Sequence, residues 1–277
     1  MTLIATFLLL ISILGWASLL LDTINLSLSQ AVFTVIAAVS SLMMMAFILH
    51  IPLISARLFI YGGLVALMVN LVTSIRMIGL KATFRTYQPI LLTMVVSVFI
   101  ISLMAWGLNF SSIDDYSFWG TISRFLFVFN QLPENADYIK ASFLQYTPGL
   151  ASFHYLLYQS AGYYSSMLNY IGQDLILIAP LLLFVNQKKL WKSLSTIMVV
   201  ITTLYLAYGN ILAKLEVDAT IAMWFFAMLW VASRPKLTSI WLLLAGLVFL
   251  SVIKEIGLLF SVFVIGVHYF CHRKKTG

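Results

Sequence analysis

Long apolar runs separated by short polar stretches dominate the chain. Four runs occupy the first 109 residues, at 2–21, 31–51, 58–80 and 89–109. Five more follow residue 165, at 171–185, 194–212, 219–233, 237–253 and 257–270. An α-helix needs about 20 apolar residues to cross the hydrocarbon core of a bilayer. The pattern therefore predicts an all-α polytopic membrane protein with about nine transmembrane helices.

A polar interval at 110–149 separates the two groups of runs. Within it, residues 117–130 carry large apolar side chains at helical spacing, which predicts an amphipathic helix on the membrane surface. The next apolar run, 150–162, is too short for a span and suits another interfacial helix. We therefore expect one integral membrane domain made of four spans (1–109), a large extracytoplasmic loop with interfacial helices (110–165) and five spans (166–277).

The composition agrees with a membrane protein and excludes several other classes. The chain is 62% hydrophobic and 9% charged, with a mean hydropathy of +1.03, whereas soluble domains carry roughly a quarter charged residues. Lipid must therefore cover its surface, and the bilayer is its first partner. The single cysteine, Cys271, excludes an internal disulfide framework and a cysteine metal cluster. The net charge of +7 is no evidence for a nucleic-acid partner, because the positions of the charges explain it.

Four groups hold eleven of the sixteen basic residues: Arg76, Lys81 and Arg85; Lys188, Lys189 and Lys192; Arg234 and Lys236; and Arg273, Lys274 and Lys275. Short cytoplasmic loops are enriched in lysine and arginine. If run 150–162 does not span, all four groups fall on the cytoplasmic side. This topology places the N-terminus outside and the C-terminus inside, with Arg57 as a basic exception outside.

The same topology places eight of the nine acidic residues on the extracytoplasmic side, and only Asp22 inside. Asp114 and Asp115 directly follow the fourth run. One of two adjacent carboxylates can take a proton from an attacking hydroxyl, while the other orients it or binds a cation. The alternative is an ordinary solvated loop.

Other charged side chains near this face leave two interpretations open. Arg124 pairs with a phosphate or extends to lipid head groups. Lys254 binds a phosphate or is neutralised by its neighbour Glu255. His154, in the short run 150–162, is more often a structural residue than a catalytic one.

The order of these motifs resembles a known family. Asp114-Asp115-Tyr116-Ser117-Phe118-Trp119-Gly120 and Tyr146-Thr147-Pro148-Gly149 are followed by an outer acid, Asp218, and by Lys254-Glu255-Ile256-Gly257. This order is similar to the GT-C superfamily of polytopic glycosyltransferases, especially bacterial members with D-[DE]-[FY]-S-x-W-G and Y-P-P-G elements. The resemblance covers roughly residues 110–260. Thr147 departs from the pattern, four spans precede the acidic loop where many relatives have one, and most relatives are much longer.

The resemblance implies a transferase of the bacterial cytoplasmic membrane that serves cell-envelope polysaccharide biosynthesis. Its donor would be a polyprenyl-phosphate sugar and its acceptor an extracytoplasmic glycan or glycoconjugate. Asp114 would be the base, and Asp115 its partner or the ligand of a divalent metal such as Mg²⁺ or Mn²⁺. Arg124 and Lys254 would stabilise the departing phosphate. Tyr146, His154, Asp218 and Glu255 complete the expected substrate-binding set.

Two other functions stay open. A transporter or flippase of lipid-linked sugars would use ionisable residues and broken helices within the membrane, and Asp174 and Pro180 in run 171–185 are of that kind. A non-catalytic or truncated membrane subunit, which needs a partner subunit, would account for a chain shorter than its relatives.

Overall fold

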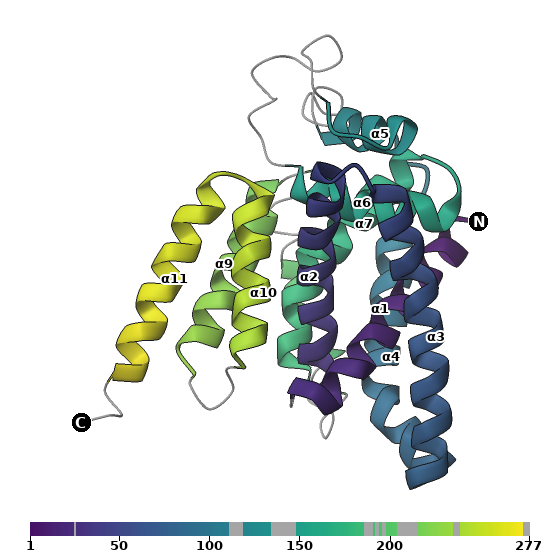
Figure 1. Ribbon diagram of the computed structural model, residues 1–277, viewed down its shortest axis with the longest axis vertical. Coiled ribbons are helices and arrows are strands. Elements are labelled where there is room, and N and C mark those ends of the chain that lie inside the picture. The colour runs from purple at the N-terminus through teal and green to yellow at the C-terminus, as the bar shows by residue number, and fades with distance from the viewer. Residues whose placement is uncertain are drawn as a thin grey trace.

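The computed structural model describes residues 1–24, 26–110, 119–133, 148–185, 191, 194–195, 198–203, 215, 217–234 and 239–273. Every element in these ranges is a helix (Figure 1). The elements are α1 (Thr2–Ile24), α2 (Leu28–Ile48), α3 (Pro52–Ile78), α4 (Leu80–Met104), α5 (Gly120–Phe129), α6 (Gly149–Ala161), α7 (Ser166–Ile178), the 3₁₀ helix η3 (Ala179–Phe184), α9 (Val217–Ala232), α10 (Ile240–Ile253) and α11 (Ile256–Arg273).

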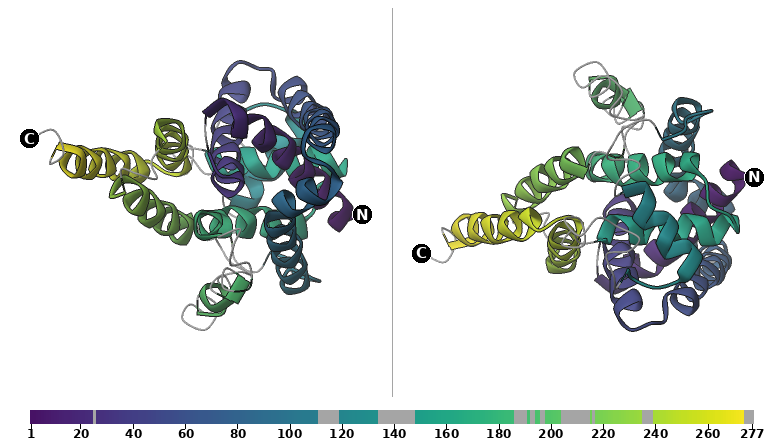
Figure 2. Two further views of the ribbon diagram at one scale, coloured as in Figure 1. Left: turned by 90° about the horizontal axis from the view of Figure 1, so that it is seen from below. Right: turned by 90° about the horizontal axis from the view of Figure 1, so that it is seen from above.

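Most of these helices run lengthwise, whereas α5 and α6 lie across one end of the bundle, which we call the upper end after Figure 1. The α2–α3 and α10–α11 connections also lie at the upper end, and the α1–α2 and α3–α4 connections lie at the lower end. Helices α9, α10 and α11 extend from one side of the bundle (Figure 2). The fold thus places two crosswise helices over the ends of lengthwise ones.

Five helical segments are long and apolar enough to cross a membrane: Thr2–Leu21, Leu28–Ile48, Pro52–Ile78, Leu80–Met104 and Ser166–Phe184. The chain is therefore an all-helical, multi-pass membrane protein in the part that the structure describes. Large apolar side chains point outward from α3, among them Leu58, Val65 and Met68, each at least 60% exposed. Such a surface is suited to lipid rather than water. Helices α9 and α10 are shorter, with 16 and 14 residues.

Both ends of α2 differ from the sequence prediction for clear local reasons. Helix α2 begins at Leu28 rather than 31, because Ser27 and Gln30 form a capping box that satisfies its first amides. It ends at Ile48, because His50 adopts a left-handed conformation with φ 58°. The helix therefore ends three residues before the predicted end of this span.

The predicted start of the fourth span at residue 89 was wrong. Helix α4 begins at Leu80, and Pro89 lies inside it. Only Gly79 separates α3 from α4, and its φ of 83° allows the chain to reverse there. Lys81 and Arg85 consequently lie in the first turns of a helix and not in a loop.

Small residues bring α1 and α3 into close contact. A Cβ atom on Gly15 would lie 1.8 Å from the carbonyl oxygen of Gly63, and the Ser12 hydroxyl donates a hydrogen bond of 2.8 Å to the carbonyl of Ile60. Such contacts are typical of helices that associate in membranes. They fix the two helices in one register.

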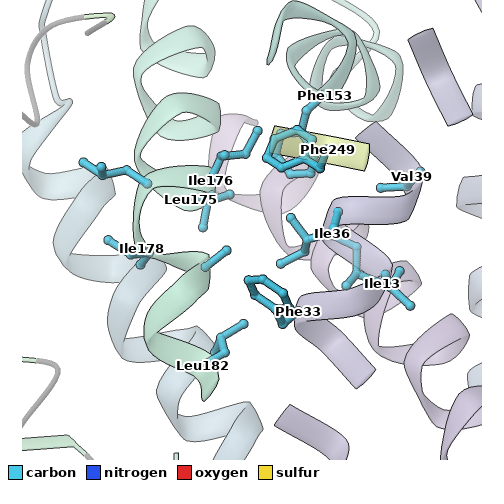
Figure 3. Close-up of a cluster of buried hydrophobic side chains, with 14 of the residues drawn as sticks. Ile13, Phe33, Ile36, Val39, Phe153, Leu175, Ile176, Ile178, Leu182 and Phe249 are labelled. Atoms are coloured by element: carbon cyan, nitrogen blue, oxygen red, sulfur yellow. The ribbon is translucent and has the colours of Figure 1, made fainter. Parts of the chain in front are cut away.

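The core lies where α1, α2, α6, α7 and α10 meet (Figure 3). Ile13, Phe33, Phe153, Ile176 and Phe249, one from each of these helices, are all fully buried there. The α6 helix is itself covered, since its first ten residues are buried. The structure therefore places α6 across the bundle end, as predicted, but inside the protein rather than on its surface.

Pro180 explains the change from α7 to the 3₁₀ helix η3. Proline has no N–H, so the carbonyl of Ile176 receives no α-helical hydrogen bond from it. The indole Nε1–H of Trp224 donates to this carbonyl at 2.9 Å, and the Trp224 ring stacks on Phe33 with centroids 4.5 Å apart. Trp224 thereby ties α9 to α7 and α2.

The basic residues predicted to be cytoplasmic share one end of the bundle wherever they are described. Arg76, Lys81 and Arg85 lie at the α3–α4 connection, and Arg234 and Arg273 follow or end helices that point the same way (Figure 1). All of these positions are at the lower end. The upper end carries the predicted site residues that the structure describes.

Candidate functional site

A pocket of about 530 Å³ opens at the upper end. Its walls come from the residues after α4, from the first turns of α5 and from the start of α7. We call it the upper pocket; it is lined by Asn109, Phe110, Gly120, Thr121, Arg124, Tyr164 and Ser166.

Hydrogen bonds fix the end of α4 against the start of α7 on one side of the upper pocket. The Ser166 hydroxyl donates to the carbonyl of Leu108 at 3.1 Å. The Tyr170 hydroxyl donates to the carbonyl of Asn109 at 3.2 Å, and its ring meets the edge of Phe110. This wall is therefore held rigidly by two spans.

Arg124 supplies positive charge on the opposite wall. It is exposed, and its guanidinium carbon lies 5.9 Å from the centre of the Tyr164 ring. Within the described ranges, no carboxylate lies within salt-bridge distance of Arg124. An exposed guanidinium of this kind can bind an anionic ligand such as a phosphate.

Tyr164 joins the two walls as a neutral phenol. Its hydroxyl donates to the carbonyl of Gly120 at 3.3 Å. Burial raises the pKa of Tyr164 to about 12, although the charge of Arg124 opposes the shift. At neutral pH the phenol therefore keeps its proton and acts as a hydrogen-bond donor.

Asp114, Asp115 and Tyr146 lie outside the described residues. The segment 111–118, which carries the two acids, joins Phe110 to Trp119, and Phe110 and Gly120 line the upper pocket. Asp114 is four residues from Phe110, and four residues span at most about 14 Å. In the sequence, the acidic pair therefore stands between two residues that line this pocket, Phe110 and Gly120.

A set of buried polar side chains lies beneath α5, and we call it the polar seam: Ser123, His154, Tyr158 and Asn169. The Ser123 hydroxyl is 3.1 Å from Nδ1 of His154, and the Tyr158 hydroxyl donates to the side-chain oxygen of Asn169. Burial lowers the pKa of His154 to about 3, so the ring is neutral at physiological pH.

The structure places His154 in the polar seam and not on the wall of the upper pocket. It is 1% exposed, and its Nε2 has no hydrogen-bond partner among the described residues. A Cβ atom on Gly172 would lie 2.5 Å from the His154 ring, so only glycine permits this approach of α6 to α7. His154 is therefore a buried group that supports α5 rather than a pocket-lining side chain.

Lys254 and Asp218 form an ion pair of 2.7 Å between the end of α10 and the first turn of α9. Lys254 thus has Asp218 as a carboxylate partner, which the sequence analysis did not foresee. Its neighbour Glu255 is exposed in the tight turn before α11, where the amide of Gly257 donates to the carbonyl of Lys254.

The Tyr-Thr-Pro-Gly and Lys-Glu-x-Gly motifs meet at this point. A Cβ atom on Gly149 would lie 2.1 Å from the carbonyl oxygen of Val252. Gly149 therefore lets the start of α6 lie directly against the end of α10, two residues before Lys254. The structure accounts for both motif glycines by packing, since a Cβ on Gly257 would lie 1.8 Å from the carbonyl of Leu250.

The structure does not bring Arg124 and Lys254 together. Lys254 lies by the start of α6. Tyr164, whose ring centre is 5.9 Å from the Arg124 guanidinium carbon, follows the end of α6. From Gly149 to Ala161 the helix advances by about 18 Å at 1.5 Å per residue. Lys254 does not line the upper pocket, so Arg124 alone is the cation among the described residues that line it.

Sequence reasoning did not identify Asn109, Thr121, Tyr164 or Ser166 as site residues. They are uncharged, and they meet only because α5 folds back over the ends of α4 and α7. One signal was present, namely the hydroxyl-rich stretch Tyr163 to Ser166 between the short run and the fifth span. Such a stretch beside a membrane span can supply hydrogen bonds to a ligand.

Two further observations concern the acidic and metal-ligating side chains of the described residues. Asp174 on α7 is fully buried, and neither carboxylate oxygen has a hydrogen-bond partner in the described part of the chain. The described His, Cys, Asp and Glu side chains form no group that could hold a metal ion.

No protein-family model matches this chain, and no curated protein or solved structure matches it.

Proposed function

We propose that the chain is a membrane glycosyltransferase that moves a sugar from a polyprenyl-phosphate donor to an acceptor outside the cytoplasm. One observation carries the proposal. The upper pocket presents Arg124 without a carboxylate partner among the described residues, and the segment that bears Asp114 and Asp115 is tethered to two of its walls. A cation and a pair of candidate bases beside one pocket are what such a transfer requires.

The described residues fit distinct parts of the donor. The guanidinium of Arg124 can hydrogen-bond two phosphate oxygens at once. Asn109, Thr121 and Ser166 offer an amide and two hydroxyls, which can bind the hydroxyls of a sugar ring. The face of the Tyr164 ring contacts the Arg124 guanidinium, 5.9 Å from ring centre to guanidinium carbon. The pocket is large enough for a sugar phosphate, whereas the small apolar cavity between α2, α4 and α7, of about 40 Å³, is not.

In the proposed reaction, an acceptor hydroxyl attacks the anomeric carbon of the donor sugar. Asp114 takes the hydroxyl proton, and Asp115 orients the acceptor or binds a divalent cation such as Mg²⁺ or Mn²⁺. A new carbon–oxygen bond forms as the bond to the phosphate breaks, and polyprenyl phosphate leaves with the bonding electrons. Arg124 stabilises the negative charge on the departing phosphate.

The proposal includes a topology of nine spans, namely α1 to α4, α7 with η3, residues 194–212, α9, α10 and α11. The upper end faces outward, because the basic residues of the lower end favour the cytoplasmic side. The N-terminus is then outside and the C-terminus inside, in a bacterial cytoplasmic membrane. The bilayer itself delivers the lipid-linked donor to this end.

A transporter of lipid-linked sugars is the second candidate, and Asp174 favours it. A carboxylate buried in a membrane span is costly and commonly marks a transport pathway. In addition, the α-helix α7 gives way to the 3₁₀ helix η3 at Pro180. Interrupted helices of this kind commonly line transport sites. A transporter would move the donor across a membrane without forming a glycosidic bond.

The test compares Arg124→Ala, Arg124→Lys and wild type in proteoliposomes that contain a polyprenyl-phosphate sugar and an acceptor. We expect Arg124→Ala to lose about 100-fold in kcat, as when one preorganised donor is removed from a developing anion. Arg124→Lys should recover only part of the loss, because lysine cannot bind two oxygens in a fixed fork. The matched control is Arg57→Ala, which removes an exposed arginine of α3 that does not line the pocket. Equal losses in Arg57→Ala and Arg124→Ala would contradict the proposal.

A further inference from the structure

The polar seam connects the upper pocket to the interior of the bundle through three helices. Ser123 belongs to α5, His154 and Tyr158 to α6, and Asn169 to α7. All four side chains are fully or almost fully buried, and none lines the upper pocket. Polar groups in such a position are costly unless they hydrogen-bond one another, so their presence calls for a role.

One arrangement of protons satisfies both hydrogen bonds of the Ser123 hydroxyl. The Ser123 hydroxyl has one proton and donates it to the carbonyl of Trp119 at 2.8 Å. With that proton engaged, the His154 tautomer that carries its proton on Nδ1 can donate to the Ser123 oxygen, 3.1 Å away. A neutral imidazole with the proton on Nδ1 leaves Nε2 as an acceptor. In this arrangement His154 is the donor toward α5.

Three hydrogen bonds attach α5 along its length. At its start the carbonyl of Gly120 accepts from Tyr164, in its middle Ser123 shares a hydrogen bond with His154, and at its end the side-chain oxygen of Asn130 accepts from Tyr155 at 2.5 Å. Apolar contacts of Ile122 and Leu126 bury the same face. The helix is therefore held at both ends and fixed in rotation about its axis.

The rotation of α5 determines where Arg124 points. Successive residues of an α-helix are about 100° apart around its axis. Because Ser123 is held inward against His154, the next residue, Arg124, is directed to the side on which the upper pocket lies. Tyr164 then holds the guanidinium from the α7 side, and the Tyr158–Asn169 bond braces α6 against α7 beneath it.

We infer that His154 and Asn169 are positioning residues for Arg124, which act through the buried hydrogen bonds of the polar seam and touch no substrate. His154 sets the rotation of α5, and Asn169 holds α7 and α6 together under it. The inference deepens the proposed function, because Arg124 is its phosphate-binding cation. The placement of α5 itself can be tested whether or not the chain transfers sugar.

The first experiment measures the position of α5 by electron paramagnetic resonance. Spin labels are placed at Val128 on α5 and Leu58 on α3, both exposed, after the only cysteine is removed by Cys271→Ser. His154→Leu should broaden or shift the distance distribution between the labels. His154→Asn should preserve it, because an asparagine amide can donate from nearly the position of Nδ1. Ser152→Ala is the control: Ser152 is equally buried on α6, but its hydroxyl bonds its own helix.

Ser123→Ala tests the same bond from the other side without changing the core of α6. It should reproduce the altered distances of His154→Leu. An unchanged distance distribution in both His154→Leu and Ser123→Ala would overturn the inference, whatever the outcome of any transfer assay.

The second experiment asks whether His154 acts only through Arg124. In the transfer assay, His154→Leu should lower kcat/KM about tenfold in the wild-type background, as expected for coupled neighbouring residues. It should have no further effect when Arg124 is already alanine, and Asn169→Leu should behave in the same way. A tenfold loss that persists in the Arg124→Ala background would overturn the inference, since His154 would then act independently of Arg124.

Discussion

Replacing Gly149 by alanine should displace α6 from α10 and destabilise the protein. The new Cβ would lie 2.1 Å from the carbonyl oxygen of Val252 and 2.7 Å from its carbon. Real Cβ contacts are essentially never shorter than 3.0 Å, so the two backbones must separate by about 1 Å in a close-packed interior. Backbone atoms lie on both sides of this contact, and neither side can move aside as a flexible side chain would.

The size of the effect follows from two opposing contributions. Overpacking in a well-packed core costs about 1–3 kcal/mol, and the rigid contact favours the upper part of that range. Alanine recovers up to about 1 kcal/mol through its higher helix propensity. We expect a net loss of about 2 kcal/mol, which corresponds to a decrease in Tm of roughly 4–8 °C for a chain of this size.

Thermal unfolding of the purified protein in detergent provides the measurement. The control is Gly266→Ala in α11, where a Cβ would meet no atom within 4 Å. This control should leave the Tm unchanged or raise it slightly through helix propensity. A Tm for Gly149→Ala equal to that of Gly266→Ala would refute the close contact between α6 and α10, and with it the packing explanation for the glycine of the Tyr-Thr-Pro-Gly motif.

Three other substitutions test separate parts of the structure. Trp224→Phe removes the Nε1–H donor to the carbonyl of Ile176 and should cost about 1 kcal/mol in the free energy of unfolding; a change below about 0.3 kcal/mol would show that this bond does not brace the break at Pro180. For His154, burial lowers the folded-state pKa to about 3 from 6.5, so protonation of the unfolded chain should reduce stability by about 1.4 kcal/mol per pH unit as pH falls below 6.5. Denaturant titrations at pH 7.5 and 5.5 should show this loss, and an equally large loss in His154→Asn would assign it to other groups. Asp218→Asn breaks an ion pair in which Asp218 is 81% exposed, so it should change stability by less than about 1 kcal/mol, an effect that high salt removes; a larger loss would mean that the pair is a main tie between α9 and α10.

The apolar runs predicted the five helical segments long enough to cross a membrane, because a bilayer-spanning helix needs a continuous apolar segment. The first run, 2–21, coincides with the apolar part of α1, and the short run 150–162 coincides with α6. Hydropathy could not locate the start of α4, because Lys81 and Arg85 are polar but compatible with a helix. In that case the left-handed Gly79, and not the hydropathy, marks the boundary.

The candidate site was predictable only in part. The sequence indicated that Arg124 lies on an amphipathic helix at one end of the bundle, since large apolar residues recur around it at helical spacing. It could not indicate that α5 lies over α6, so neither the upper pocket nor the polar seam was foreseen. Both depend on contacts between residues far apart in the chain, such as Gly120 with Tyr164 and Ser123 with His154. The partner of Lys254 was missed for the same reason, because Asp218 precedes it by 36 residues.

The most direct test of the central proposal is sugar transfer from a polyprenyl-phosphate donor in proteoliposomes, with Asp114→Asn and Asp115→Asn beside the wild type. Membrane insertion of each variant is checked in the same preparation. We predict that the wild type forms the glycosidic product and that Asp114→Asn inserts normally but forms none. Product formation by Asp114→Asn and Asp115→Asn at the wild-type rate would contradict the proposed role of the acidic pair, and the absence of product from the wild type with a range of sugar donors would contradict the proposed function itself.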